Sequence, residues 1–258
     1  MILTIESLVL LCIGFFIIAS LYSSVGFGGG SSYLALLTLF FAEFYHIRSI
    51  ALLCNIIVVS GTTYWYFKEG HVRLKEMVPF VIASIPLAFI GASFRLNEKV
   101  FFIVLGGALI VSALFLIGQT YMENKEVEKG NKDQKFVTYL LGGSIGLLSG
   151  VVGIGGGIFL APVLNHIKWN VSIKIAALAS FFILVNSISG IGGLVYSNTF
   201  QVPWIETIAL VLTVFIGGQI GIRISLKRLS ANGIKRVTAI LVFIVGFRVL
   251  LVNGLDIT

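Results

Sequence analysis

The chain has 258 residues, of which 57% are hydrophobic and 11% charged, and a formal net charge of +7. Its mean hydropathy of +1.04 and its scarcity of charges exclude a soluble globular domain, in which about 25% of residues are charged. The basic residues lie between long apolar runs, as topology signals do, so the positive charge does not indicate nucleic-acid binding. Cys12 and Cys54 lie inside apolar runs without metal-ligand spacing, so we expect neither a disulfide framework nor a metal site.

Long, uncharged and repeated apolar runs predict membrane-spanning helices rather than a β-barrel. In chain order, the apolar segments lie near residues 7–24, 31–45, 48–67, 77–94, 100–118, 137–152, 158–167, 174–196, 204–222 and 236–252. One charged stretch divides them into two sets of five, so we expect a first repeat over 1–120, a cytoplasmic linker over 121–136 and a second repeat over 137–258. The second segment of each set is short, and IFLAPVLNHI offers roughly 15 Å of helix, about half of a bilayer's hydrocarbon core.

The two halves share a glycine motif. In SSVGFGGGSSYLALL and GVVGIGGGIFLAPVL, glycines 26, 28, 29 and 30 fall on glycines 153, 155, 156 and 157 at a constant offset. Further along, RSIALL, which begins at Arg48, matches KIAALA, which begins at Lys174, with an offset that differs by one residue. An internal duplication is the simplest account of these matches.

The distribution of Lys and Arg predicts how the chain is oriented, because these residues accumulate in cytoplasmic loops. If the ten segments alternate in direction, the loops on one side of the membrane contain fourteen basic residues. The loops on the other side contain Arg48, Arg95 and Lys99, and Arg248 is the only cation inside a span. This tally places the linker in the cytoplasm and both termini outside the cytoplasmic membrane. Because five is odd, the second half is inverted relative to the first. We therefore expect an all-α polytopic membrane protein of two inverted repeats, each a glycine-rich hairpin with a short half-helix plus three spanning helices.

Inverted repeats with helices interrupted at matching positions are the architecture of secondary transporters, whose substrates bind near the midplane. Glycine permits positive φ and a close approach of a ligand to the backbone. Each short helix begins just after a glycine run, so its free N–H groups and partial positive charge predict an anion site. Small-residue helix packing explains part of the enrichment instead, because Gly142, Gly146 and Gly150 recur every four residues. Nucleotide binding is disfavoured, because no Gly-Lys-Ser/Thr follows either run.

Two copies of a Gly-x-Gly-Gly-Gly run, one after the first apolar segment and one after a central charged stretch, resemble the TauE/SafE sulfite exporter family, also called TSUP. The resemblance covers the whole chain in layout, and its specific part is Gly26–Gly30 and Gly153–Gly157, with Pro162 also matching. The first repeat departs from the pattern, because Ala35 stands where Pro162 stands in the second. The resemblance implies transport of sulfur-containing anions such as sulfite, thiosulfate and organosulfonates across the cytoplasmic membrane.

The candidate substrate-binding residues are polar or glycine residues at the motifs and in the third span of each half. They are Gly28, Gly29, Gly30, Ser31, Ser32, Gly155, Gly156, Gly157, Ser23, Ser24, Asn55 and Asn186. Serines in membrane helices often bond their own backbone instead, and each asparagine is either a bond between helices or a substrate contact. From the motif alone, we expect Gly156→Val to abolish flux while folding stays largely intact.

The acidic side chains fall at or near segment boundaries, which disfavours proton coupling through a midplane carboxylate. Facilitated or Na⁺-coupled anion movement by alternating access remains, with backbone carbonyls at the helix breaks able to hold Na⁺. The sequence has no catalytic constellation and suggests no cofactor, so we do not expect an enzyme. An anion channel built on the same motifs and a membrane-embedded assembly partner without a transport role are the alternatives.

Overall fold

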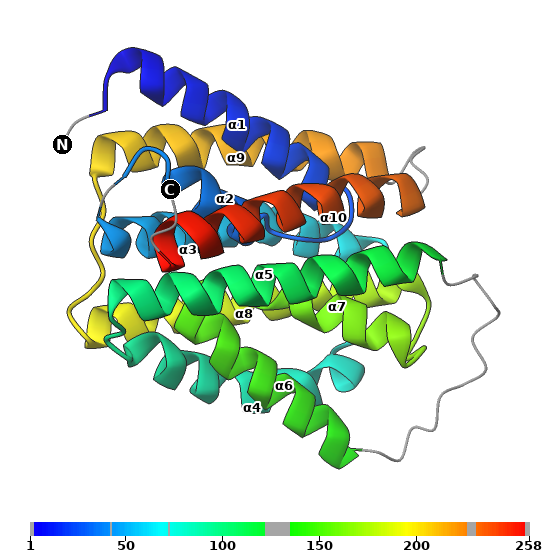
Figure 1. The fold of residues 1–258 in the computed structure, drawn as a ribbon. Helices are drawn as coiled ribbons and strands as arrows, with labels where there is room; N and C mark the ends of the chain where they lie inside the picture. The colour runs from blue at the N-terminus through cyan, green and yellow to red at the C-terminus, as the bar shows by residue number, and fades with distance from the viewer. Residues whose placement is uncertain (1–2, 42, 72, 122–134, 226–230, 256–258) are drawn as a thin grey trace.

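The computed structural model describes residues 3–41, 43–71, 73–121, 135–225 and 231–255, and over these ranges its regular structure is helical throughout. In chain order the helices are α1 Ile5–Ser23, α2 Gly30–Leu37, α3 Phe44–Lys68, α4 Leu74–Ser93, α5 Glu98–Tyr121, α6 Lys135–Val152, α7 Gly157–His166, α8 Ser172–Tyr196, α9 Trp204–Ser225 and α10 Ala231–Arg248. A π-helical turn, η1 Val249–Gly254, continues α10. Figure 1 shows most of these helices side by side in one bundle.

Among the described residues, 6 helices are long and apolar enough to cross a membrane, namely α1, α3, α4, α5, α8 and α9. Helices α2 and α7 have 8 and 10 residues. At about 1.5 Å per residue they reach only about half of the hydrocarbon core. The predicted all-helical membrane class, with a short second helix in each half, is confirmed.

Two predicted boundaries were wrong, and both lie around the start of α3. The second segment, predicted over 31–45, is helical only to Leu37. Beyond it the N–H groups of Leu39 and Phe40 donate to the carbonyls of Leu36 and Leu37 at 3.1 and 3.0 Å, so a tight turn replaces the helix. Helix α3 begins at Phe44, four residues before the predicted start at 48. The apolar sequence FFAEFYHI hides this break, because hydropathy does not distinguish a buried connection from a helix.

The predicted linker over 121–136 lies mostly outside the described residues. Helix α5 extends to Tyr121 and α6 begins at Lys135. In Figure 1, α5 ends and α6 begins at one end of the bundle, and α1 begins and η1 ends at the other.

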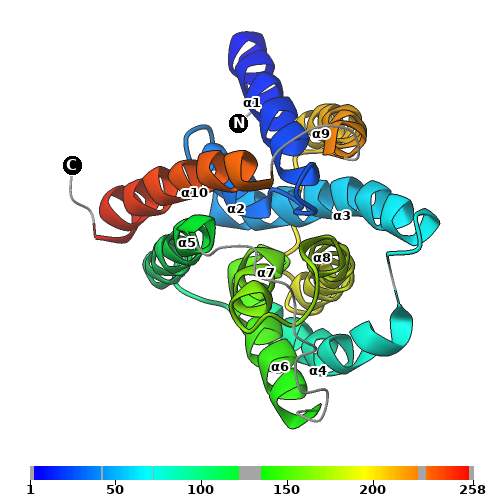
Figure 2. The same ribbon diagram turned by 90° about the vertical axis from the view of Figure 1, so that its right-hand side faces the viewer.

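The helices of the two halves pack across the division between them. Helix α1 packs along α9, and α6, its counterpart in order, packs along α4. Figure 2 shows these pairs on opposite sides of the bundle, with α3 and α8 in contact at its centre. Helices α5 and α10 pack together and contact the short helices α7 and α2 of the opposite halves. The central pair and the two short helices position the candidate site.

Helices α3 and α8 set the register between the halves. Each has 25 residues, and they begin at Phe44 and Ser172 and end at Lys68 and Tyr196, a constant offset of 128. Arg48 therefore corresponds to Ala176, and the sequence match of Arg48 with Lys174 was wrong by two residues. Runs of Ala, Leu and Ile match at several registers, so composition alone did not determine the offset.

Three of the glycines that recur every four residues pack α6 against the backbone of α4, as the packing alternative predicts. A Cβ atom at Gly146 would lie 2.6 Å from Ser84 Cα. Cβ atoms at Gly142 and Gly150 would overlap the carbonyl groups of Phe80 and Ala88, respectively. Gly221 of α9 similarly lies against the Ser20 carbonyl of α1. These glycines allow the close helix contacts that hold the outer pairs together.

Candidate functional site

Each glycine motif ends in a left-handed residue immediately before a short helix. Gly29 has φ 89° and Gly156 has φ 86°, and neither α2 nor α7 has a side chain hydrogen-bonded at its N-terminus. L-amino acids with a side chain rarely adopt this conformation, which accounts for glycine at both positions. Gly156→Val would therefore strain the fold, and its Cβ would lie 2.9 Å from Phe182 Cε1. The expectation that folding stays largely intact in this variant is not supported.

The two short helices begin with free backbone donors. In α2, Tyr33 N–H donates to the Gly29 carbonyl at 2.9 Å, and in α7, the N–H groups of Phe159 and Leu160 both donate to the Gly156 carbonyl, at 3.0 and 3.1 Å. By the geometry of an α-helix, the N–H groups that precede these have no carbonyl to meet inside the helix. They belong to Gly30, Ser31 and Ser32 in α2, and to Gly157 and Ile158 in α7.

The two motifs meet at Asn55, near the middle of α3. Asn55 Nδ2 donates to the carbonyl of Ile154 in the second motif at 3.0 Å. A Cβ atom at Gly28 of the first motif would lie 2.5 Å from Asn55 Oδ1, and one at Gly30 would also overlap the amide. Asn55 is fully buried, and its Oδ1 has no hydrogen-bond partner within the described residues. One amide thus contacts the glycine motifs of both halves.

The second motif lies against α8 in the same way. A Cβ atom at Gly155 would lie 2.6 Å from Ile183 Cγ2 and 2.8 Å from Ser187 Oγ. Ile183 is the counterpart of Asn55 at the offset of 128. Ser180 of α8 reaches the first motif, where its hydroxyl donates to the Gly26 carbonyl at 2.7 Å. Figure 2 shows α2 beside α3 and α7 beside α8.

The predicted serines fall into two groups. Ser31 and Ser32 lie in the first turn of α2. The hydroxyl of Ser31 is buried without a partner in the described structure, and that of Ser32 lies 2.6 Å from Tyr22 Oη. Ser23 and Ser24 instead lie at the end of α1 and donate to the Ser20 and Leu21 carbonyls at 3.4 and 2.6 Å. Their hydroxyl groups bond their own helix, which is the alternative considered for such serines.

Asn186 lies on α8, one turn after Ile183. Its side chain is 1% exposed, and neither its Oδ1 nor its Nδ2 has a hydrogen-bond partner among the described residues. The hydroxyls of Ser187 and Ser149 are also buried and unpartnered, and both lie next to the second motif, at Gly155 and Gly156 respectively. Two unpartnered hydroxyl groups therefore lie against the second motif, and Asn186 lies on the same helix as one of them.

Arg48 is the residue that sequence analysis missed. It was assigned to an external loop, but it lies inside α3 and is 1% exposed. Its Nη2 donates to the Gly150 carbonyl of α6 at 3.0 Å, and its guanidinium carbon lies 5.7 Å from the ring centres of both Phe44 and Phe101. Arg248, predicted to be the only cation inside a span, is exposed at the end of α10. Hydropathy offered no signal for it, because the apolar residues before Arg48 do not reveal where the connection ends and the helix begins.

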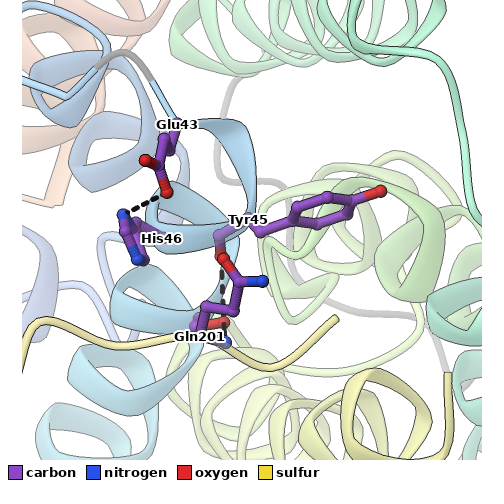
Figure 3. A network of polar contacts seen from close by, with 5 residues as sticks. Glu43, Tyr45, His46 and Gln201 are labelled. Carbon is purple, nitrogen blue, oxygen red and sulfur yellow. Dashed lines mark hydrogen bonds and ion pairs between the residues drawn. The ribbon is translucent and has the colours of Figure 1, made fainter. Parts of the chain in front are cut away.

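The start of α3 is fixed by polar contacts, which Figure 3 shows. His46 Nδ1 lies 3.2 Å from Glu43 Oε2. The Ser49 hydroxyl donates to the Tyr45 carbonyl at 2.9 Å and accepts from the backbone N–H of Gln201 at 3.1 Å. Because Gln201 belongs to the connection between α8 and α9, these contacts attach the turn that carries Arg48 to the opposite half.

Comparisons with known proteins cover nearly the whole chain. The family described as sulfite exporter TauE/SafE matches residues 10–249. A probable membrane transporter protein, y4hK of Sinorhizobium fredii, is 32% identical over 244 residues, which are 93% of this chain and 97% of that protein. A probable membrane transporter protein, YunE of Bacillus subtilis, is 25% identical over 265 residues, covering 93% of this chain and 96% of that protein. No solved structure matches.

Proposed function

Because the chain belongs to the TauE/SafE family of sulfite exporters and its relatives are named as membrane transporters, we propose that it is a secondary transporter of small sulfur-containing anions of the sulfite, thiosulfate or organosulfonate class. The anion binds between the N-termini of α2 and α7, beside Asn55. One observation carries this proposal: two helix N-termini without side-chain caps, from different halves of the chain, follow glycine motifs that both contact one buried amide.

The chemistry of this site fits an oxyanion. Each helix N-terminus has a partial charge of about +0.5, so two of them complement roughly one negative charge without a basic side chain. The oxygens of a sulfur oxyanion accept hydrogen bonds from the N–H groups of Gly30–Ser32 and Gly157–Ile158. The Ser31 hydroxyl is a further donor, since no partner in the described structure holds it.

We infer alternating access around this site, with the second half inverted relative to the first. The exchange of helix pairs, α1 with α9 and α6 with α4, is the pattern that a two-fold axis gives to two repeats. The odd number of helical segments in each half favours an axis in the membrane plane. The full burial of Asn55 favours a carrier over the alternative of a channel, because a continuous pore exposes its lining.

The substrate class is tested by uptake of radiolabelled sulfite into proteoliposomes that contain the purified protein, with acetate and phosphate as control anions. We expect saturable uptake that an unlabelled organosulfonate competes away. Conductance steps in a planar bilayer would instead favour the channel. If no sulfur anion enters faster than into protein-free vesicles, the proposed substrate class is wrong.

For the driving force, we expect an inward Na⁺ gradient to stimulate sulfite uptake and a pH gradient alone to have no effect. Among the described residues, the one buried carboxylate, Glu206, lies in the first turn of α9, where it accepts from Leu3 N–H at 3.3 Å, and not beside Asn55. The two gradients are imposed separately on the same vesicles. Uptake driven by the pH gradient alone would contradict this coupling.

For topology, we propose a multi-pass protein of the cytoplasmic membrane with both termini outside. Helices α3, α5, α7 and α9 end at the same end of the bundle in Figure 1, and basic residues flank these ends, including Lys68, Arg73 and Lys168. In a chain without Cys12 and Cys54, we expect Glu69→Cys to react with an impermeant maleimide only after the membrane is permeabilised. Asn97→Cys should react in intact cells, and the reverse pattern would invert the assigned orientation.

A further inference from the structure

The buried cation Arg48 has donors that the fold does not use. Its Nη2 bonds to the Gly150 carbonyl, but its Nε and Nη1 atoms are buried and have no partner within the described residues. No salt bridge joins Arg48 to a carboxylate within the described residues. A buried charge without a counter-ion is strongly unfavourable, and inside a membrane protein such a residue usually has a functional reason.

The position of Arg48 ties it to the second glycine motif. Its side chain lies along Gly153, where a Cβ atom would come 3.7 Å from both Cβ and Cγ of Arg48. Along α3, Arg48 precedes Asn55 by seven residues, which is about 10 Å of helix. The guanidinium is therefore close to the proposed central site but on the side where α3 begins.

Arg48 has no counterpart in the other half. The residue at the offset of 128 is Ala176, which packs against Gly26 just as Arg48 packs against Gly153. The backbone motifs of the two halves are alike, whereas the cation is present on one side only. A residue needed only for packing would not require a charge there, since alanine fills the matching position.

We propose that the Arg48 guanidinium is a second binding site for the transported oxyanion, on the route between the side where α3 begins and the Asn55 site. The anion accepts hydrogen bonds from the donors left free at Nε and Nη1, and its charge neutralises the arginine. The rings of Phe44 and Phe101 beside the guanidinium keep water away and strengthen this attraction. This inference rests on the proposed function, because it assigns a further residue to the same substrate.

The test compares Arg48→Gln with the wild type in two measurements on the full chain. The first is the rise in melting temperature that sulfite causes, and the second is KM for sulfite uptake. We expect the sulfite-dependent rise to become smaller, because only the Asn55 site then binds the anion, and KM to increase about tenfold, as for the loss of a charge-assisted hydrogen bond. Arg48→Lys, which retains the charge, should recover part of both. Arg95→Gln is the matched control, because Arg95 also donates to a backbone carbonyl, that of Ser197, but is exposed.

A purely structural Arg48 predicts a different result. Arg48→Gln would then melt at a lower temperature without sulfite but would keep the full sulfite-dependent rise and the wild-type KM, and this outcome overturns the proposal. If Arg48→Gln does not fold, phenylglyoxal, which modifies arginine, provides the second measurement. Sulfite should reduce the inhibition of wild-type uptake by the reagent. In Arg48→Lys, we expect sulfite not to reduce the inhibition. Equal protection in both proteins contradicts the proposal.

The same two measurements distinguish the proposed function from the role of Arg48. A wild type without sulfite uptake and without a sulfite-dependent rise contradicts the proposed function and the role of Arg48 together. A wild type that has both, alongside an Arg48→Gln variant with the same rise and the same KM, contradicts only the role of Arg48.

Discussion

Replacing Gly30 by alanine is expected to reduce sulfite uptake at least about tenfold while the protein still folds, because the new methyl group enters the proposed anion site. Gly30 is the first residue of α2 and does not have positive φ, so alanine suits its backbone. Its Cβ would overlap the amide of Asn55, with Asn55 Cγ at 2.9 Å. The amide must then leave its position between the two motifs, and the N–H groups at the start of α2 become partly covered.

The control for this variant is Gly107→Ala in α5, where a Cβ atom would meet nothing within 4 Å. Initial uptake rates and melting temperatures are measured for both variants in parallel. Gly107→Ala should melt close to the wild type, Gly30→Ala should fold but melt somewhat lower because the hydrogen bond from Asn55 to Ile154 is disturbed, and only Gly30→Ala should lose transport. If Gly30→Ala transports as fast as Gly107→Ala, the anion does not bind at this helix N-terminus. Gly156→Val cannot separate these effects, because positive φ strains any side chain there.

Replacing Gly146 by leucine is expected to destabilise the whole protein by about 3 kcal/mol or more, because overpacking a tight contact displaces backbone as well as side chains. The Cβ atom would lie 2.6 Å from Ser84 Cα and 2.7 Å from the Ser84 carbonyl oxygen. Neither backbone atom can move aside without separating α6 from α4, a pair that forms one side of the bundle in Figure 2. Most of the protein should be lost before purification, and the remainder should melt well below the wild type.

Gly143→Ala is the matched control on the same helix. Its Cβ would come closest to Leu87 Cδ1, at 2.8 Å, and this methyl group is the far end of a flexible side chain. We expect near-wild-type yield and melting temperature for Gly143→Ala. Equal stability of Gly146→Leu and Gly143→Ala would show that the α4–α6 contact is not close-packed at Ser84.

Helix number, the two half-length helices and the glycine-rich breaks could be predicted from the sequence, because they depend on local properties. Apolar length sets what can cross a bilayer, and a run such as Gly28–Gly30 is a poor helix interior. The convergence of both motifs on Asn55 depends instead on how α3 and α8 cross, which hydropathy does not encode. Asn55 was a candidate because a buried amide in an apolar span needs a partner, but its contact with both halves was not predictable.

Arg48 was missed for a related reason. A basic residue at the start of an apolar run looks like a loop charge, and the tally of loop charges used it in that way. The structure buries it because the preceding residues, from Phe44 onward, extend α3 by a full turn and the connection at Gln201 holds that turn in place.

The most direct test of the account is to locate a bound anion. We would determine the structure of the full chain with thiosulfate and use the anomalous scattering of its sulfur atoms to place the ion. We expect thiosulfate between Gly30 and Gly157, within hydrogen-bond distance of the first N–H groups of α2 and α7 and beside the Asn55 amide. Thiosulfate bound specifically elsewhere, with the Asn55 amide still between the two motifs, would contradict it.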